Sequence, residues 1–138
     1  MRVFLDANIL VSVLNKEYPV FTYSSRILSL ADNRQFALFT SPICLAIAFY
    51  FAEKKSGTAS AKNKIELLAS KLSVTEVGKS EVMSSLKNVK VNDFEDGLEY
   101  YAALNSKCTA IITEDMGDFY FSEIEVFDSK NFLGKYLI

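Results

Sequence analysis

Carboxylates are the main candidates for catalytic or metal-binding side chains in this sequence, because its 138 residues contain no histidine. Without an imidazole, Ser-His-Asp and Cys-His nucleophiles are excluded, and so is a zinc site built from histidines. Phosphate-binding loops are excluded as well, because none of the five glycines lies in a G-x-G-x-x-G or G-x-x-x-x-G-K pattern. Catalysis would therefore rest on carboxylates, hydroxyls, lysines or a bound metal ion.

Three short acidic segments stand out along the chain, and two of them closely follow the apolar runs 3–5 and 109–113. Carboxylates that gather at one end of a sheet repel one another unless a cation compensates them. Oxygen ligands suit Mg²⁺ or Mn²⁺, and such an ion can activate water and stabilise charge on a phosphoryl group. The acids of the three segments are Asp6, Asp93, Glu95, Asp96, Asp115 and Asp118.

Most of these acids also have an ordinary structural explanation, which the sequence alone leaves open. Asp6 could equally be the N-cap of a following helix. Asn92 and Glu95 fit a capping box, and Asp93 could cap the same helix, which favours a structural role for Asp93. Asp96 would then lie in the first turn of that helix, where the helix dipole favours a negative charge.

Short apolar strands alternate with helical segments, an order typical of a three-layer α/β/α sandwich around a mostly parallel sheet. In such sheets ligands bind beyond the carboxyl ends of the strands, where Asp6 and Asp115 are expected. The segment 54–63 predicts a turn between two helices. We expect strands at 3–5, 36–40, 73–78, 109–113 and 124–129, and helices at 9–14, 20–34, 41–55, 61–72, 79–88, 92–107 and 130–137.

Length and composition indicate one domain over residues 1–138, with an apolar half large enough to form a core. The net charge of −2 argues against gripping nucleic acid by bulk positive charge, but not against local or metal-mediated contacts. No apolar run is long enough for a membrane span, and Asp6 and Asn8 interrupt the signal-like start. We therefore expect a cytoplasmic protein. Cys44 and Cys108 lack metal-like spacing and are expected to be buried thiols.

The ordered motifs resemble those of the PIN domain, the ribonuclease fold of the VapC-type toxins, over nearly the whole chain. The family's first motif is an apolar strand followed by D-[TA]-N, which residues 6–8 match. Its third motif is D-x-x-D-A with a later alanine pair, which residues 93–103 match with glycine in place of the first alanine. Its fourth motif, an apolar strand followed by T-x-[DN]-x-x-D-F, is matched by residues 113–119.

The resemblance implies a PIN-like fold and a metal-dependent endoribonuclease that cleaves RNA phosphodiesters with Mg²⁺ or Mn²⁺. It assigns the catalytic and metal-binding acids as Asp6, Asp96 and Asp115, with Asp118 as an additional or alternative ligand and Asn8 and Thr113 as supporting hydrogen-bond partners. VapC-type proteins form homodimers and are neutralised by a small antitoxin. The resemblance therefore also implies an RNA substrate, an antitoxin partner and a homodimer.

The second motif departs from the family pattern, S-x-x-[TS]-x-x-E, in which the glutamate lies on the helix after the second strand. The segment begins as expected at Ser41, but Ile47 stands at the glutamate position. Glu53 is six residues further on, which rotates the helix by about 600° and moves about 9 Å along its axis, so Glu53 is not expected to replace it. An alternative interpretation is therefore a PIN-like module that binds RNA or a protein without effective catalysis.

A phosphatase of the haloacid-dehalogenase type is a third interpretation, since its nucleophilic aspartate also follows the first strand. That family requires D-x-D, whereas Asn8 stands at the second position here. Its catalytic lysine precedes the final acids, but the nearest candidate, Lys107, comes before the strand 109–113 instead. Both departures argue against this interpretation.

Basic and aromatic residues near the turn 54–63 are candidates for contacts with RNA or with a partner. Lys54 and Lys55 could bind phosphates, although the end of a solvated helix, where the dipole favours cations, explains them equally simply. Lys62 and Lys64 belong to the same cluster. The consecutive aromatics at 49–51 cannot all face one core, so at least one of them is expected to face a groove or a dimer partner.

Overall fold

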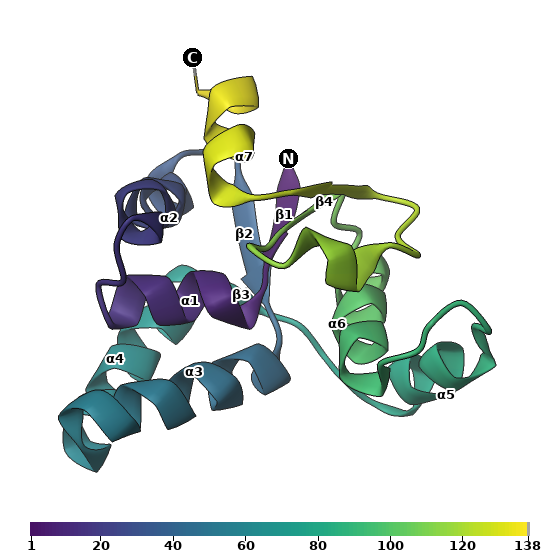
Figure 1. Cartoon of the computed structure of the whole chain (residues 1–138), viewed down its shortest axis with the longest axis horizontal. Coiled ribbons are helices and arrows are strands. Elements are labelled where there is room, and N and C mark those ends of the chain that lie inside the picture. Colours follow the sequence, from purple (N-terminus) through teal and green to yellow (C-terminus); the bar gives the residue numbers. More distant parts are fainter. Residues whose placement is uncertain (138) are drawn as a thin grey trace.

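The computed structural model describes residues 1–137 and has a five-stranded, all-parallel sheet flanked by helices, as the sequence predicts (Figure 1). The strands are β1 (Arg2–Leu5), β2 (Ala37–Thr40), β3 (Ser73–Val74), β4 (Ala110–Ile112) and β5 (Glu125–Phe127). The helices are α1 (Ala7–Leu14), α2 (Val20–Leu28), α3 (Pro42–Ser56), α4 (Thr58–Lys71), α5 (Lys79–Lys87), α6 (Phe94–Asn105) and α7 (Ser129–Tyr136). Two short 3₁₀ turns, η1 (Ser29–Asp32) and η2 (Met116–Phe119), complete the elements.

The strand order is β3-β2-β1-β4-β5. Strands β2 and β3 therefore lie on one side of β1, and β4 and β5 lie on the other. This order puts α1 and α2 on one side of the sheet and α5 and α6 on the other (Figure 1). The crevice beyond the carboxyl ends of β1 and β4 is the usual ligand-binding position in such a sheet. The fold therefore opens a place for ligands where Asp6 and Asp115 follow their strands.

Apart from the exposed Arg2, the two central strands are completely buried, which explains their apolar sequences. Val3, Phe4 and Leu5 are 0% exposed, and so are the three residues of β4. Strands covered on both faces have no solvent side to favour alternating polar residues. Leu5 pairs with Ile112 in the parallel register, so the residues that follow them leave the sheet side by side.

Each predicted helix is present, but bounds differ: the helix predicted for 20–34 ends at Leu28 and continues as η1, and the turn predicted for 54–63 is much shorter. Helix α3 continues to Ser56 and α4 begins at Thr58, so Gly57 alone separates them. Gly57 has a φ of +84°, a conformation that glycine adopts without steric cost. The prediction of a long turn was wrong because one such residue is enough to redirect the chain, and the serine, threonine and alanine around it are compatible with helix.

Two further boundaries differ from the predictions. The strand predicted for 73–78 forms ladder pairs only at Ser73 and Val74, because β3 lies at the edge of the sheet and pairs with β2 alone. The first helix begins at Ala7 rather than at residue 9, directly after its cap. Helix α3 begins as predicted, with Pro42 at its first position and the Ser41 hydroxyl accepting a hydrogen bond of 3.1 Å from the Cys44 amide.

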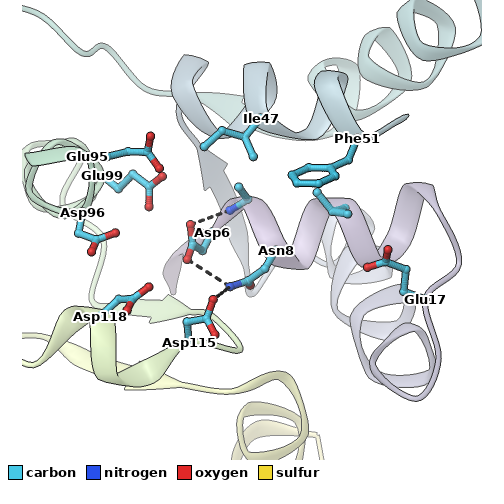
Figure 2. A pocket seen from close by; sticks show the side chains of 12 residues that line it. Asp6, Asn8, Glu17, Ile47, Phe51, Glu95, Asp96, Glu99, Asp115 and Asp118 are labelled. Atoms are coloured by element: carbon cyan, nitrogen blue, oxygen red, sulfur yellow. Dashed lines mark hydrogen bonds between the residues drawn. The ribbon is translucent and has the colours of Figure 1, made fainter. Parts of the chain in front are cut away.

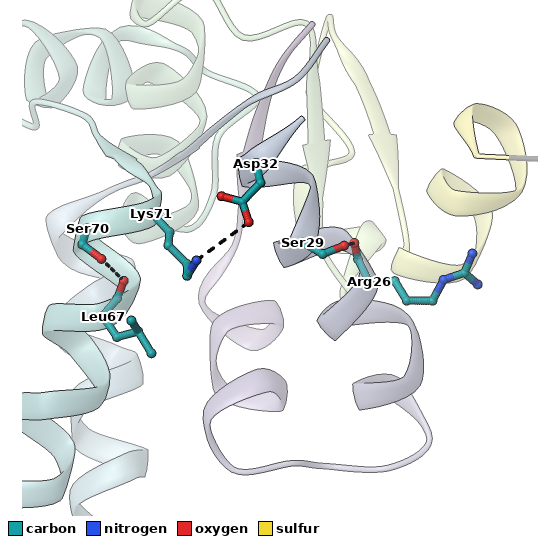
Figure 3. Close-up of polar contacts among 6 residues, drawn as sticks. All are labelled: Arg26, Ser29, Asp32, Leu67, Ser70 and Lys71. Atoms are coloured by element: carbon teal, nitrogen blue, oxygen red, sulfur yellow. Dashed lines mark hydrogen bonds and ion pairs between the residues drawn. The ribbon is translucent and has the colours of Figure 1, made fainter. Parts of the chain in front are cut away.

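Exposed polar contacts join α4 and η1 away from the β1–β4 crevice. The end of α4 meets η1 through the ion pair of Lys71 and Asp32, 4.0 Å apart (Figure 3). Both side chains are exposed, so this pair adds little to the free energy of unfolding. Ser70 on α4 and Ser29 on η1 bond back to carbonyl oxygens three residues earlier, at 2.6 and 2.5 Å (Figure 3).

Expectations for the two cysteines and for a membrane span can be compared with the structure. Cys44 and Cys108 are both free and buried, which confirms the prediction of buried thiols. Among residues 1–137, no helix combines the length and the apolar character that crossing a bilayer requires.

Candidate metal centre

A pocket of about 340 Å³ opens beyond the carboxyl ends of β1 and β4 (Figure 2). Seven of its twelve lining residues are acidic, and none of the described residues that line it is basic. All four acids assigned to a metal site from the sequence lie here, together with three that were not. The acidic lining residues are Asp6, Glu17, Glu95, Asp96, Glu99, Asp115 and Asp118.

The carboxylate of Asp6 is held at the bottom of this pocket by its own helix and by the neighbouring strand. Its Oδ1 accepts a hydrogen bond of 2.7 Å from the Ala7 amide, and Asp6 is the N-cap of α1. Its Oδ2 accepts a hydrogen bond of 2.8 Å from the hydroxyl of Thr113. Only 8% of Asp6 is exposed. Asp6 is therefore an N-cap, a role that the sequence left open. The cap also holds the Asp6 carboxylate in the pocket.

Asn8 and Thr113 connect Asp6 to Asp115. The Asn8 amide nitrogen donates to Thr113 Oγ1 at 3.0 Å. It also donates to Asp115 Oδ2 at 3.3 Å (Figure 2). The Asn8 carbonyl accepts from the Glu114 amide at 3.1 Å, which anchors the loop after β4. Thr113 Oγ1 in turn accepts from the Asp115 amide at 3.1 Å. This network fixes the relative position of two carboxylates that come from opposite ends of the chain.

The start of α6 brings Asp96 to the other side of the pocket. Asp93 is the N-cap of α6, and its Oδ1 accepts a hydrogen bond of 3.2 Å from the Asp96 amide. The structural role favoured for Asp93 is thus confirmed, and Asp93 does not line the pocket. The capping box predicted from Asn92 and Glu95 is wrong, because the helix begins one residue later than that pairing requires.

Close packing of α5 against α6 depends on Gly97. A Cβ atom at this position would lie 2.8 Å from Val91 Cγ1 and 3.0 Å from the Ser85 side chain. Distances this short force neighbouring atoms apart. Gly97 therefore allows the approach that sets the position of Asp96 and the rest of α6.

Glu99 is a pocket acid that the sequence analysis missed, as it also missed Glu17. The Glu99 side chain is buried, with 2% exposed, and its Oε1 accepts a hydrogen bond of 3.4 Å from the Cys44 thiol. Burial and the nearby Asp6 carboxylate raise the pKa of Glu99 to about 10. A signal was available: Glu99 comes four residues after Glu95 and three after Asp96, so it lies on the same face of the helix as both.

Burial and then mutual repulsion raise the pKa values of the carboxyl groups that face the pocket from α6 and η2. Burial raises the pKa of Asp96 to about 7, with further contributions from Asp93, Asp118 and Asp6. The pKa values of Glu95 and Asp118 are raised by burial and by neighbouring carboxylates. A cation bound in such a pocket would favour the ionised forms of these acids, because it compensates their burial and mutual repulsion.

The acids of this pocket fit a hard divalent cation. Ligand atoms of Asp6, Glu99 and Cys44 all lie within 4.8 Å of one another. Burial and the two neighbouring carboxylates raise the pKa of the Cys44 thiol well above its usual range, so Cys44 acts as a hydrogen-bond donor rather than as a thiolate ligand. The remaining donors are carboxylate oxygens, which Mg²⁺ and Mn²⁺ prefer.

Helix α3 contributes apolar side chains to the pocket instead of an acid. Ile47 and Phe51 both line it, and Phe51 is 44% exposed (Figure 2). The expectation that one of the aromatics at 49–51 faces a groove is therefore confirmed. Glu53 does not line the pocket and accepts a hydrogen bond of 2.9 Å from Thr58 instead, in agreement with the expectation that it does not replace the missing glutamate.

The candidate RNA-binding lysines lie at the last turn of α3, outside the pocket lining. The Lys54 ammonium lies over the ring of Tyr50, 5.2 Å from its centre. Lys55 donates a hydrogen bond to the carbonyl oxygen of Asn15, just after α1. Their last-turn position is the one favoured by the helix dipole. Contact of either lysine with RNA stays a prediction.

Comparison with known proteins gives one family and several similar folds. The family model of the PIN domain matches residues 2–117. No curated protein matches the sequence. Three solved structures resemble the fold at TM-scores of 0.66 to 0.69.

Two of these structures are VapBC proteins. A chain of VapBC2 from Rickettsia felis, bound to a DNA fragment from their promoter, has 18% sequence identity and a TM-score of 0.69, with 93% of the present chain and 98% of that chain covered. A chain of VapBC-1 from nontypeable Haemophilus influenzae has 19% identity and a TM-score of 0.69, with 94% and 99% covered. The third, VapC20 from Mycobacterium tuberculosis, is a toxin that cleaves the sarcin-ricin loop, at 14% identity, a TM-score of 0.66, and 89% and 98% coverage.

Proposed function

Because the chain belongs to the PIN domain family, we propose that it is a metal-dependent endoribonuclease and the toxin of a toxin–antitoxin pair. The observation that carries the proposal is the pocket at the carboxyl ends of β1 and β4, which gathers seven carboxylates without a basic lining residue among those described. A pocket of this charge repels the phosphates of RNA unless a cation lies in it. The proposed activity therefore depends strictly on a divalent metal ion.

Carboxylates from three separate elements would hold Mg²⁺ or Mn²⁺: Asp6 after β1, Asp96 on α6 and Asp115 after β4, with Asp118 on η2 as a further candidate. Bound there, the ion would supply an activated water and stabilise charge on the phosphodiester. Asn8 and Thr113 would keep Asp6 and Asp115 in place through the hydrogen bonds that already join them. Orientation of ligands by such outer contacts typically affects metal affinity by about 10- to 100-fold.

The exposure of the acids suggests how RNA would approach. Asp6 is buried, whereas Asp115 and Asp118 are exposed, so the pocket has a closed floor and an acidic rim. A phosphodiester would enter over that rim. Lys54 and Lys55, near the far end of α3, are the basic residues that we propose to contact the RNA backbone beyond the pocket.

A small antitoxin protein is the proposed partner, in line with the VapBC proteins that share this fold. We propose that the toxin forms a homodimer and acts in the cytoplasm, where RNA and a co-expressed antitoxin are both available.

The experiment that tests the proposed function is digestion of mixed RNA by the purified protein with Mg²⁺, Mn²⁺ or EDTA. We expect cleavage with either metal ion, none with EDTA, and none by an Asp6→Asn variant. Cleavage that persists in EDTA, or an absence of cleavage by the wild type under all conditions, would reject the proposal.

A second candidate function, a PIN-like module that binds RNA or protein without cleaving, is favoured by Ile47 in place of the expected glutamate. A thermal melt of the protein with millimolar Mg²⁺ or Mn²⁺ discriminates the two. A large stabilisation that disappears in Asp96→Asn supports the nuclease, and no stabilisation supports the module.

The phosphatase interpretation does not fit the fold. Lys107 precedes β4, whereas the acids Asp115 and Asp118 follow it. The lysine is therefore at the opposite end of the strand from the pocket, and the match to the PIN domain covers Asp6, Lys107 and Asp115.

A further inference from the structure

Glu99 and Ile47 face the same pocket from opposite helices. Ile47 reaches it from α3, at the position where the family pattern has a glutamate, and Glu99 reaches it from α6 (Figure 2). The pocket therefore lacks an acid on one wall and has an additional acid on the other. The number of carboxylates around Asp6 is preserved although the sequence motif is broken.

The surroundings of Glu99 are unusual for a structural glutamate. The side chain is buried, and the described part of the chain places no lysine or arginine in ion-pair contact with it. The Cys44 thiol, a weak donor, reaches it at 3.4 Å, and its other polar partner is the carboxyl group of Asp6, which brings no positive charge. A buried carboxyl group without a cation or strong donors is costly to the folded state. An apolar residue would fill the same position without that cost.

The distances near Asp6 are compatible with a shared metal ion. The closest ligand atoms of Asp6, Glu99 and Cys44 lie within 4.8 Å of one another. Two oxygens bound to one Mg²⁺ at about 2.1 Å are at most about 4.2 Å apart, so a small side-chain rotation would bring both carboxylates onto one ion. Asp6 is fixed by its cap and by Thr113, which leaves Glu99 as the group that adjusts.

We propose that Glu99 is a metal ligand of this site and takes from α6 the place that the family glutamate takes from α3. The ligand is a hard divalent cation, Mg²⁺ or Mn²⁺. This inference rests on the proposed function, since it concerns the same metal site. It also explains why the loss of the second-motif acid need not abolish metal binding.

The test is a titration of the purified protein with Mn²⁺ alone, followed by electron paramagnetic resonance of the free ion, for wild type and four variants. One of them, Asp6→Asn, is expected to bind no Mn²⁺. Glu99→Gln keeps the shape of the side chain and removes its charge. Glu17→Gln is the matched control, because Glu17 lines the same pocket at its far end, near Phe51 (Figure 2). The double variant Ile47→Glu/Glu99→Gln returns the acid to the family position on α3.

We expect Glu99→Gln to weaken Mn²⁺ binding by at least about tenfold. The control Glu17→Gln should bind like the wild type, and the double variant should recover most of the lost affinity. Thermal melting in EDTA verifies that each variant is folded. If Glu99→Gln does not fold, Glu99→Asp, which keeps the charge but shortens the side chain, should weaken binding in its place.

Two results would overturn the inference but leave the proposed function intact. One is Mn²⁺ binding by Glu99→Gln at the affinity of the wild type while Asp6→Asn binds none, which would make Glu99 a structural acid. The other is a double variant as weak as Glu99→Gln, because the two positions would then not be equivalent. A wild type that binds no Mn²⁺ would overturn the inference and the metal-dependent function together.

Discussion

The Thr113 hydroxyl donates a hydrogen bond of 2.8 Å to Asp6 Oδ2, and so joins the two central strands just beyond their last paired residues. Thr113 is 0% exposed, and the same hydroxyl oxygen accepts hydrogen bonds from Asn8 and from the Asp115 amide. One buried hydroxyl thus organises both ends of the acidic pocket.

Replacing this hydroxyl with a methyl group in Thr113→Val should destabilise the fold by about 1–3 kcal/mol, because buried partners lose their hydrogen bonds. It should also weaken Mn²⁺ binding, since Asp6 and Asp115 lose their common partner. Urea unfolding and Mn²⁺ titration measure the two effects. Thr109→Val is the matched control, because Thr109 is exposed before the other end of β4 and should tolerate the change. Equal effects of the two variants would contradict this account.

Asp6→Asn separates the capping role of Asp6 from its role in the pocket. Asparagine is as good an N-cap as aspartate, so the start of α1 should be preserved. In EDTA the variant should melt at or above the temperature of the wild type, because one carboxylate is removed from a crowd of acids. The stabilisation by millimolar Mn²⁺ should be lost.

The control for this variant is Asp128→Asn, which changes the N-cap of α7, where Oδ1 accepts a hydrogen bond of 2.7 Å from the Asn131 amide. It should retain the full stabilisation by Mn²⁺. A normal metal response in Asp6→Asn would show that Asp6 is only a cap.

Stability of the metal-free protein should fall as the pH rises. The folded-state pKa values of Glu99, about 10, and Asp96, about 7, lie above their unfolded values, so the folded state binds more protons. Below pH about 4 both groups are protonated in both states and their contribution is fully favourable. As the pH rises further, this favourable contribution to stability decreases. It is lost above about pH 7 for Asp96 and above about pH 10 for Glu99.

Thermal melting in EDTA between about pH 5 and about pH 9, for the wild type and for Glu99→Gln, measures this dependence. The variant should show a shallower decline, because the glutamine side chain that replaces the carboxyl group does not titrate in this range. A wild type whose stability rises over the same range would contradict the assigned directions.

Gly97→Ala should destabilise the packing of α5 against α6. The new methyl carbon would lie 2.8 Å from Val91 Cγ1, and overpacking of this kind costs about 1–3 kcal/mol. Gly134→Ala on α7 is the control, because nothing lies within 4 Å of its Cβ position, and it should stabilise by about 0.5–1 kcal/mol through helix propensity. Urea unfolding of the two variants should give opposite signs, and a neutral Gly97→Ala would show that α6 can shift.

The sequence predicted the sheet and two of the pocket acids for a clear physical reason. Buried parallel strands are short apolar runs, and a charge directly after such a run must lie at the edge of the sheet. Asp6 and Asp115 could therefore be placed before any tertiary contact was known. The order of the strands could not be predicted from these runs. Each run is apolar on both faces, so nothing in its sequence indicates which strand pairs with it.

Glu99 does not follow a strand, so it could not be placed in the same way. Its spacing puts it on the helix face of Glu95 and Asp96, but the apolar segment LEYYAAL around it is typical of a helix interior. Its role depends on the rotation of α6, which Gly97 and the contacts with α5 determine. Lys55 is similar, because its bond to the Asn15 carbonyl depends on how α3 crosses α1.

An anomalous difference map from a crystal of the wild type soaked in millimolar Mn²⁺ would show directly whether Asp6 and Glu99 share a metal ion. We expect a peak within the pocket, contacted by carboxylate oxygens of Asp6 and Glu99. A map without a peak there, or with peaks only on surface carboxylates outside the pocket, would contradict this expectation.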